Sequence, residues 1–195
     1  MPSYLGKYQG AAKDREKKLR RAINSVVNQS YPNWELIIVA DGCQKTVGIV
    51  KSYKDPRIKG FLIPKQAKWD GTQRNAGIYK STKDWIIYLD TDDLYEPDYL
   101  ENLNKEMTTH DWYYVDDIYY EPIGKKWFRN NTSLEFTRCG TSSIIHKRSL
   151  GVFWARGNTY AHDWVFISRL MKFDNFAKLN ALGYKVMHVP FKYDL

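Results

Sequence analysis

Two short, almost wholly apolar runs end abruptly in acidic residues, and they constrain the fold of this chain more than any other feature. The first run, residues 35–40, stops at Asp41, and the second, residues 85–89, leads straight into Asp-Thr-Asp-Asp at residues 90–93. Apolar side chains at nearly every position of a short run are typical of a strand covered on both faces. The sequence therefore predicts two buried strands that each deliver carboxylates to the edge of a sheet.

Segments with the spacing of amphipathic helices lie around these strands, and the clearest covers residues 14–29. The other elements expected in the first half are a helix at 45–54, a strand at 58–63, and helices at 70–80 and 97–107. Strands that alternate with helices predict an α/β fold with a mostly parallel central sheet flanked by helices. A length of 195 residues without internal repeats favours a single domain, residues 1–195.

The second half of the chain is less regular. Residues 112–120 alternate loosely between apolar and polar side chains, and short strands are expected at residues 142–146 and 185–189. Residues 162–173 have the spacing of a helix that begins with an acid. This half therefore continues the α/β pattern without a clear strand order.

The two acidic strand ends are expected to face one crevice, because ligands of open α/β sheets bind beyond the carboxyl ends of the strands. Asp90, Asp92 and Asp93 repel one another unless a cation lies between them, and hard oxygen ligands suit Mg²⁺ or Mn²⁺. Water and diphosphate oxygens complete the coordination of such ions. Any one of the three acids alone is explained equally well as the cap of a turn or helix.

Two further polar residues have competing interpretations. Arg74 lies between the two acidic strand ends in the sequence, where a guanidinium could contact a phosphate or an acidic neighbour. An exposed helical position explains it equally well. Asp163 stands at the start of a predicted helix, where an acid is favoured as a cap or by the helix dipole. The residues alone leave the role of Arg74 open and favour the cap role for Asp163.

The formal net charge of +8 permits nucleic acid, an anionic membrane surface or phosphorylated small molecules as partners. The densest basic run, residues 13–21, is interrupted by acids, and we interpret it as the water-facing side of a helix. Nucleic acid is therefore not the expected partner.

Cysteine use and hydropathy bear on the compartment. Cys43 and Cys139 lie far apart without metal-type spacing, which fits free thiols in a reducing compartment, although one disulfide stays open. The first twenty residues hold no apolar core of a signal peptide, and no run approaches the ~18 apolar residues of a membrane span. A soluble, cytoplasmic protein is expected, with peripheral membrane contact left open.

Four segments together resemble glycosyltransferase family 2. They are residues 25–42, the Arg-Asn-Ala-Gly of residues 74–77, the Tyr-Leu-Asp-Thr-Asp-Asp of residues 88–93 and the His-Asp-Trp of residues 162–164. They occur in the family's order, and the likeness spans residues 2 to about 170. The resemblance implies a single GT-A domain with a Rossmann-like half that binds a nucleotide sugar, about residues 1–108, and an acceptor half, about residues 109–195.

The resemblance also implies which residues bind the donor, a UDP-sugar or another nucleotide diphosphate sugar. Asp41 would hydrogen-bond the base, and Pro2, Ser3 and Tyr4 would line the base pocket. Arg74 would lie close to the base or the phosphates.

The remaining implied roles concern metal binding and catalysis. Asp92 and Asp93 would hold Mn²⁺ or Mg²⁺ and the ribose–diphosphate end of the donor, with Asp90 supporting them. Asp163 would be the general base that takes the proton of an acceptor hydroxyl. The implied reaction inverts the anomeric carbon of the transferred sugar and delivers it to a saccharide or another hydroxyl-bearing acceptor.

The sequence departs from the family pattern at three points. Family members begin with an apolar strand, whereas Met1 directly precedes Pro2 here, so the first central strand is expected to be short. Ala40 replaces an acid often paired with Asp41, and His162 stands where a Glu commonly precedes the base. Acceptor contacts are expected from the second half, at Trp127, residues 139–141 and Trp154.

Two other classes of protein remain open from the sequence. A nucleotidyltransferase would share the nucleotide-binding sheet and the acidic metal site, but its Gly-rich loop matches residues 6–10 poorly. A basic module that binds nucleic acid or glycan without catalysis is compatible with the charge and with an aromatic content of 15%. The order of the motifs favours the glycosyltransferase over both. The oligomeric state is not predicted.

Overall fold

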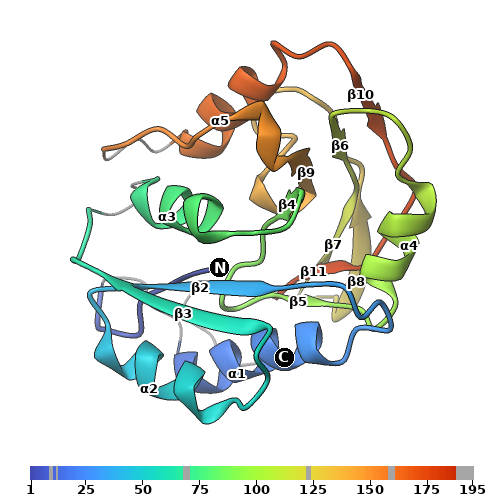
Figure 1. The fold of residues 1–195 in the computed structure, drawn as a ribbon. Coiled ribbons are helices and arrows are strands. Elements are labelled where there is room, and N and C mark those ends of the chain that lie inside the picture. The colour runs from blue at the N-terminus through green and yellow to red at the C-terminus, as the bar shows by residue number, and fades with distance from the viewer. Residues whose placement is uncertain (9–10, 12, 68–70, 122–123, 158–160, 188–195) are drawn as a thin grey trace.

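The computed structural model describes residues 1–8, 11, 13–67, 71–121, 124–157 and 161–187 (Figure 1). The helices are α1 (Arg15–Val27), α2 (Gln44–Ser52), α3 (Thr72–Lys80), α4 (Tyr99–Glu106) and α5 (His162–Leu170), with short 3₁₀ turns at Thr141–Ser143 and Arg148–Leu150. The strands are β1 (Pro2–Ser3), β2 (Leu36–Asp41), β3 (Ile58–Ile63), β4 (Trp85–Ile87), β5 (Leu94–Tyr95), β6 (Trp112–Tyr114), β7 (Asp117–Glu121), β8 (Lys126–Asn130), β9 (Ile144–Lys147), β10 (Phe176–Lys178) and β11 (Tyr184–Val186).

The first half forms a three-layer unit around a parallel sheet in the order β1-β2-β3. Helices α1 and α2 cover one face of this sheet and α3 covers the other (Figure 1). All six residues of β2 are buried, as its run of apolar side chains predicts for a strand between two helical layers. Asp41, its last residue, therefore emerges at the carboxyl end of the most protected strand.

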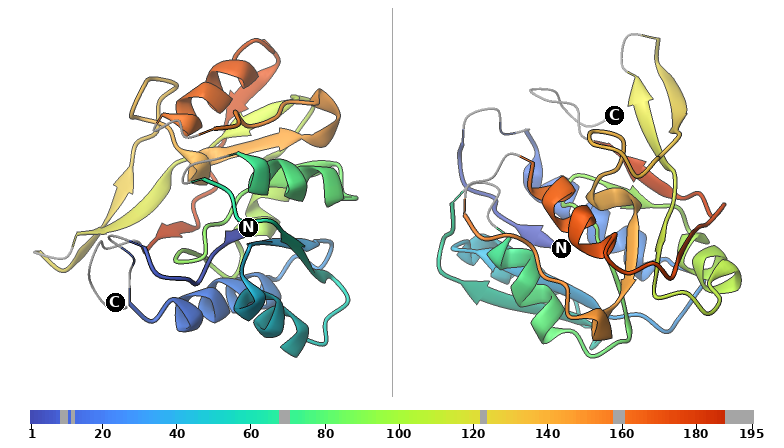
Figure 2. Two further views of the ribbon diagram at one scale, coloured as in Figure 1. Left: turned by 90° about the vertical axis from the view of Figure 1, so that its left-hand side faces the viewer. Right: turned by 90° about the horizontal axis from the view of Figure 1, so that it is seen from above.

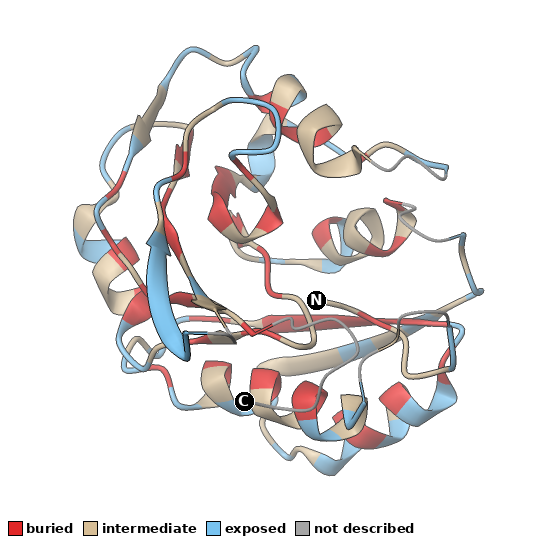
Figure 3. Ribbon diagram, turned by 180° about the vertical axis from the view of Figure 1, so that it is seen from behind, coloured by how far each residue is buried: buried red, intermediate tan, exposed pale blue. Residues whose placement is uncertain are grey.

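The second half contains two mixed four-stranded sheets. One has the order β10-β6-β9-β4, and the other has the order β5-β11-β7-β8. Helix α5 packs on the first of them through Phe166, Ile167 and Leu170, which are all buried. The β7–β8 hairpin projects from the body of the molecule (Figure 2), and most of β8 is exposed (Figure 3).

Two apolar clusters hold these layers together. The larger one joins α1 and β2 to α4 through side chains such as Leu19, Ile38 and Leu103. The smaller one joins β4 and β9 to α5 through side chains such as Ile86 and Phe166. The first half of the chain is thus anchored on β2, and the second on the sheet that contains β4.

The structure confirms the α/β class, and the predicted helices are present with ends shifted by at most three residues. Three short strands, β5, β8 and β10, were not predicted. The strand expected at residues 85–89 ends at Ile87, and the strand expected at 185–189 is β11, with residues 188–189 outside the described part of the chain. Parallel and antiparallel pairs are mixed in the second half, which the alternation of elements did not predict.

The interpretation of the basic run as a purely water-facing surface is wrong. Lys18 is only 1% exposed, and Arg21 donates a hydrogen bond of 2.7 Å to the backbone oxygen of Asp92. The apolar stripe of α1 alone could not reveal this, because the Arg21 contact joins positions 71 residues apart.

None of the helices in the described ranges is both long and apolar enough to cross a membrane. Cys43 and Cys139 are buried free thiols, as their spacing predicted.

Candidate active site

Strands β2 and β4 run in the same direction and bring their acidic ends to the same side of the molecule. Before the strands begin, the Glu35 carboxylate accepts the backbone N–H groups of Thr82 (2.5 Å) and Lys83 (3.0 Å). Beyond the strands, Pro2 pairs with Val39 of β2 and lines one cavity with Asp90 and Asp92. The carboxyl ends of the two strands therefore lie on the same side of the molecule, although Asp41 itself does not line that cavity.

Asp41 forms an ion pair with a lysine of the protein. Its buried carboxylate lies 2.6 Å from Lys65 Nζ and accepts the backbone N–H of Gln66 at 2.7 Å. Lys65 Nζ in turn lies 4.3 Å from the centroid of the Tyr4 ring. Ser3 is buried in a 3.0 Å hydrogen bond with Thr46. Among the residues expected at the base pocket, Asp41 is thus paired with the Lys65 ammonium, and the Tyr4 ring lies beside that ammonium.

Asp90 forms an ion pair with Arg74, but this pair does not fully offset the cost of burying the Asp90 carboxylate. An Arg74 Nη atom donates to Asp90 Oδ1 at 3.0 Å. Removal of the Asp90 carboxyl from water nevertheless raises its pKa, Arg74 acts against this shift, and the negative charges of Asp92 and Asp163 add to it. One guanidinium is therefore shared among more negative charge than it neutralises.

Asp93 points into the protein rather than into the crevice. Its Oδ2 accepts the Tyr184 hydroxyl at 2.8 Å and its Oδ1 accepts the Met187 backbone N–H at 2.7 Å. Burial raises the pKa of Asp93 well above its usual value, and the charges of Asp92 and Asp90 raise it further. Both oxygens are used to tie the acidic stretch to β11 and the residue after it, whereas Asp90 and Asp92 are only half-buried.

A small polar cavity lies beside Asp92, with a volume of about 110 Å³. Its lining residues are Pro2, Tyr8, Arg15, Lys18, Asp90, Thr91 and Asp92. Among the described residues, no three His, Cys, Asp or Glu side chains form a group that could hold a metal ion. The donor set fits a cation that takes two carboxylates from the protein and its remaining oxygens from a ligand, and the basic side chains opposite suit an anionic ligand.

Arg74 is fixed at the centre of the site by its neighbours. The guanidinium carbon lies 4.7 Å from the centroid of the Trp154 ring, and the next residue, Asn75, exchanges two hydrogen bonds with the Trp154 backbone (3.0 and 2.7 Å). Arg74 Nε is buried, and no described side chain or backbone group accepts its hydrogen. The Arg74 side chain is only 11% exposed, so the exposed helical alternative is wrong.

Asp163 is held as a carboxylate by its neighbours. Its Oδ1 accepts the Thr141 hydroxyl at 2.6 Å and lies 3.1 Å from His162 Nε2. Burial acts to raise the pKa of Asp163, but the contacts with His162 and Thr141 and the charge of Arg74 outweigh it, so the pKa is lowered. The carboxylate remains partly exposed, with its side chain 37% accessible. This is the environment of an ionised group that can receive a proton.

The residues expected to contact an acceptor do not lie together in one site. Thr141 touches Asp163 directly, and Cys139 lies close enough that Asp117 and Asp163 contribute, after burial, to raising its pKa to about 12. Trp154 is 2% exposed and packs under Arg74 and on α5, so it supports the site from below. Trp127 lies on the projecting hairpin, against Tyr120 and Lys185.

Several site residues were missed by the sequence reasoning. Lys65 comes directly after β3, so the rule that located Asp41, carboxyl ends of neighbouring parallel strands, could have found it. Tyr184 and Met187 bear no signal of that kind, because their link to Asp93 joins positions more than ninety residues apart.

Comparison with known proteins finds relatives over most of the chain. The family described as Glycosyl transferase family 2 matches residues 11–176. An uncharacterized glycosyltransferase of Haemophilus influenzae is 38% identical over 96 residues, which make up 47% of this chain and 38% of that protein.

Two solved structures show the same fold. S. aureus TarS 1–349 in complex with UDP-GlcNAc matches 98% of this chain and 58% of that chain, with a TM-score of 0.75 and 15% identity. Mannosyltransferase PcManGT from Pyrobaculum calidifontis, in complex with GDP-Man and Mn²⁺, matches 93% of this chain and 54% of that chain, with a TM-score of 0.65 and 16% identity. The chain spans less than two-thirds of the length of each of these three proteins.

Proposed function

Because the chain belongs to glycosyl transferase family 2, we propose that it transfers a sugar from a nucleotide diphosphate sugar, a UDP-sugar in the first instance, to an acceptor hydroxyl. The observation that carries this proposal is the position of Arg74. It pairs with Asp90 in the acidic stretch and interacts with Asp163 on the other side of the site. A diphosphate placed beside Arg74 would lie near its guanidinium. An acceptor hydroxyl on the other side would lie near the Asp163 carboxylate, which could take its proton.

The first half is assigned to the donor. The base would lie in the pocket of Ser3, Tyr4 and Asp41, where Tyr4 offers a ring for stacking and the Asp41 carboxylate accepts an N–H of the base. The UDP-GlcNAc bound to TarS supports a uridine donor. The diphosphate would extend from there past Pro2 into the cavity beside Asp92.

A divalent cation, Mn²⁺ or Mg²⁺, fits beside Asp92. Asp92 and Asp90 both line the small polar cavity, and their mutual repulsion contributes to the raised pKa of Asp90. When bound, the cation would neutralise the negative charge that builds on the nucleoside diphosphate leaving group. Asp93 would position Asp92 from behind, because its own oxygens are engaged by Tyr184 and Met187. The presence of Mn²⁺ in the PcManGT complex supports a divalent metal in this proposal.

Asp163 is assigned as the general base. One of its oxygens would accept the proton of the acceptor hydroxyl while that hydroxyl oxygen attacks the anomeric carbon. The bond from this carbon to the diphosphate oxygen breaks on the opposite side, so the configuration inverts and the nucleoside diphosphate leaves. Thr141 and His162 orient the carboxylate, and Arg74 stabilises its ionised form before the proton arrives.

The second half is assigned to the acceptor, a saccharide or another hydroxyl-bearing molecule. Residues 139–141 border Asp163, and an added Cβ on Gly140 would come within 4.0 Å of Asp163 Oδ2. We expect the acceptor hydroxyl to enter along this segment.

A donor screen tests the proposed function. The protein is incubated with UDP-Glc, UDP-Gal, UDP-GlcNAc and GDP-Man, each with Mn²⁺, Mg²⁺ or EDTA, and the release of nucleoside diphosphate is measured. Release from at least one donor, lost in EDTA, is expected. The proposal is contradicted if no donor is turned over and UDP with Mn²⁺ produces no thermal shift at millimolar concentration.

Two further assays identify the two alternatives, one with nucleoside triphosphates and one with nucleic acid. Release of pyrophosphate from a nucleoside triphosphate would identify a nucleotidyltransferase. Binding of DNA or RNA that falls steeply with salt, without any effect of UDP, would identify a basic binding module.

A further inference from the structure

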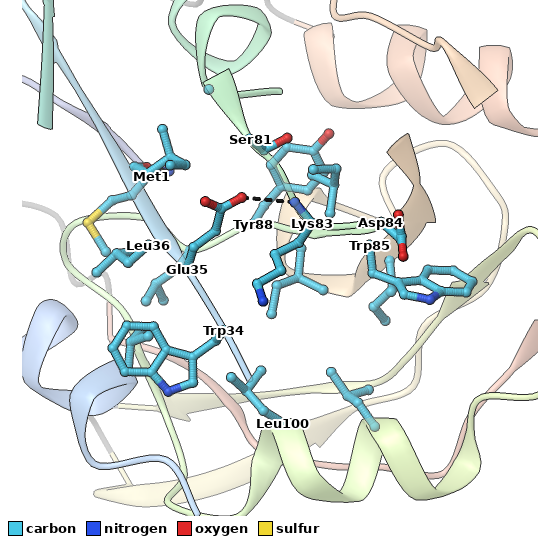
Figure 4. A pocket seen from close by; sticks show the side chains of 18 of the residues that line it. Met1, Trp34, Glu35, Leu36, Ser81, Lys83, Asp84, Trp85, Tyr88 and Leu100 are labelled. Atoms are coloured by element: carbon cyan, nitrogen blue, oxygen red, sulfur yellow. Dashed lines mark hydrogen bonds between the residues drawn. The ribbon is translucent and has the colours of Figure 1, made fainter. Parts of the chain in front are cut away.

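Large apolar side chains are incompletely packed in two places. One is a cavity of about 260 Å³ between β2 and β4, lined by side chains such as Leu36 and Leu100 (Figure 4). The other is the β7–β8 hairpin, where Tyr119, Trp127 and Phe128 are 42%, 40% and 43% exposed. The hairpin projects from the body of the molecule, so a partner can reach these three rings directly (Figure 2).

The hairpin carries aromatic side chains on both of its faces. Successive side chains of a strand point to opposite faces, and the register places Tyr119 opposite Phe128 and Tyr120 opposite Trp127. The ring centroids lie 5.8 Å apart in the first pair and 5.1 Å apart in the second. Such cross-strand pairs stabilise a hairpin, but the exposed parts of these rings form an apolar surface of the kind that marks interaction sites.

Lysines accompany the rings. Lys125 and Lys126 are exposed at the start of β8, and Lys185 Nζ lies 4.9 Å from the centroid of the Trp127 ring. Tryptophan and tyrosine are enriched where proteins meet the boundary between a membrane and water. Lysines close to such a boundary are attracted to anionic lipid headgroups. The composition of the hairpin therefore suits an anionic lipid surface.

The geometry of the hairpin favours this partner over a protein strand or a saccharide. Within the described residues β8 is the terminal strand of its sheet, but Lys126 and Arg129 place charges on it, which discourages pairing with a strand of another molecule. A saccharide stacked on a ring covers one face of a strand pair. The interfacial layer of a bilayer surrounds an inserted hairpin and covers both faces at once.

We propose that the β7–β8 hairpin docks the protein on a lipid bilayer that carries anionic headgroups. Trp127 and Phe128 directly follow Lys126, the first residue of β8, so they lie within about 10 Å of that end of the strand. Interfacial segments enter the region between headgroups and acyl chains by about 5–10 Å, which matches this length. The lysine ammonium groups can stay among the headgroups while their carbon chains pack along the rings.

The base of the hairpin is tied to the segment that borders Asp163. The Ser142 hydroxyl donates to Asp117, the first residue of β7, at 2.5 Å. The neighbouring Thr141 hydroxyl donates to Asp163 at 2.6 Å. Five residues of strand span about 17 Å, so a docked hairpin would hold residues 139–141 within roughly 20 Å of the lipid surface.

Sedimentation with vesicles tests the contribution of the rings. The vesicles contain either equal parts of phosphatidylglycerol and phosphatidylcholine or phosphatidylcholine alone. The wild type should bind the anionic vesicles at least about tenfold more tightly than the neutral ones. The double change Trp127→Ser with Phe128→Ser should weaken binding to the anionic vesicles at least about tenfold. Tyr79→Ser, which removes a 79% exposed ring on α3, is the matched control and should bind like the wild type.

A second pair of variants tests the contribution of the lysines. Lys125→Gln with Lys126→Gln should weaken binding to the anionic vesicles at least about tenfold, and 500 mM salt should reduce the binding of the wild type. The matched control is Lys51→Gln with Lys54→Gln, which removes two exposed lysines at the end of α2 and beyond it. This control should lose no more than about threefold.

Hydrogen exchange on the unchanged protein adds a measurement that does not depend on any substitution. With anionic vesicles, the amides of residues 117–121 and 126–130 should exchange at least about fivefold more slowly, and those of β3 should be unaffected. Absence of binding to anionic vesicles, equal binding by all five proteins or unchanged exchange in the hairpin would each overturn the proposal. Binding of RNA, of an oligosaccharide or of a second copy through the hairpin, without binding to vesicles, would also overturn it. None of these readouts uses sugar transfer, so they are independent of the donor screen.

Discussion

The acid that ends β2 and the acids that follow β4 are handled in different ways. Asp41 has a lysine of the protein 2.6 Å away and a backbone N–H on its other oxygen. Asp90 shares one guanidinium with the charges of Asp92 and Asp163, and its pKa is raised, first by removal from water. The protein pairs the first carboxylate with a lysine, whereas at the second site Arg74 does not fully offset the burial of Asp90 and the charges of its acidic neighbours.

This difference indicates which ligand group belongs at each place. A carboxylate whose charge is already balanced by a neighbouring lysine can accept a hydrogen bond from a neutral group such as a nucleobase. A carboxylate cluster with too little positive charge binds a cation, and the cation then attracts a diphosphate. Asp41 at the end of β2 would therefore bind the base of a nucleotide sugar, and the acids after β4 would bind its diphosphate through the cation.

Asp163→Asn is expected to have the largest effect. The change removes the proposed proton acceptor and leaves both strand ends intact, so transfer should fall by about 10²–10⁴-fold. UDP affinity in the presence of Mn²⁺ should change less than about twofold. Steady-state transfer and isothermal titration with UDP measure the two quantities. Transfer at the wild-type rate would show that another group takes the proton.

Asp92→Asn and Asp41→Asn together probe the contrast between the strand ends. Asp92→Asn should weaken UDP binding about 100-fold with Mn²⁺ and have little effect in EDTA, because it would remove a proposed ligand of the metal. Asp41→Asn should weaken binding by a similar factor with and without the metal. Titrations of both variants with UDP in Mn²⁺ and in EDTA give the comparison. An identical metal dependence of UDP affinity in the two variants would contradict the proposed difference between the strand ends.

Asp93 is predicted to matter through stability. Asp93→Ala leaves the Tyr184 hydroxyl and the Met187 N–H without their acceptor, at a cost of about 2–3 kcal/mol in the free energy of unfolding. Asp93→Asn keeps an oxygen for Met187 and should cost less than about 1 kcal/mol. Urea denaturation measures both. Equal losses would mean that the charge, rather than the hydrogen bonds, matters.

The same pair of proteins has a pH signature. The pKa of Asp93 is raised in the folded state, so its ionisation opposes folding as pH rises above the usual range of a carboxyl. Asn does not ionise. The stability of Asp93→Asn relative to the wild type should therefore increase between pH 4 and pH 8. A difference that stays flat, or falls, over this range would contradict the raised pKa.

Lys65→Met is expected to have the smallest effect on stability. The Lys65 side chain is 45% exposed, so loss of its pair with Asp41 should cost less than about 1 kcal/mol. The change would nevertheless leave Asp41 without its cation and make the first site resemble the second. UDP affinity should then acquire a stronger dependence on ionic strength, measured by titration between 50 and 500 mM salt.

Features encoded within one stretch of chain were predictable from the sequence. The apolar run of β2 and its terminal Asp41 were correct, and the family and its GT-A type fold are confirmed. Helix α5 also begins at His162, as the pattern predicted. Local periodicity and motif order suffice in these places, because burial on both faces leaves few alternatives for such a run.

Features that depend on distant contacts were not predictable. The inward orientation of Asp93 requires Tyr184 and Met187, and the burial of Lys18 requires the chain that packs on α1. β8 is largely exposed, so it lacks the apolar alternation that marks a half-buried strand. The sequence placed three acids together, and the fold decided which of them faces the crevice.

The most direct test of this account is a thermal shift measurement with UDP and Mn²⁺, added separately and together, on the wild type and Asp92→Asn. We predict that the two ligands together, at about 100 times the dissociation constant, raise the wild-type melting temperature by about 5–10 °C. Each ligand alone should raise it by far less, and Asp92→Asn should show no joint effect. A joint shift of equal size in Asp92→Asn would contradict the claim that the acids after β4 require a cation from outside the protein.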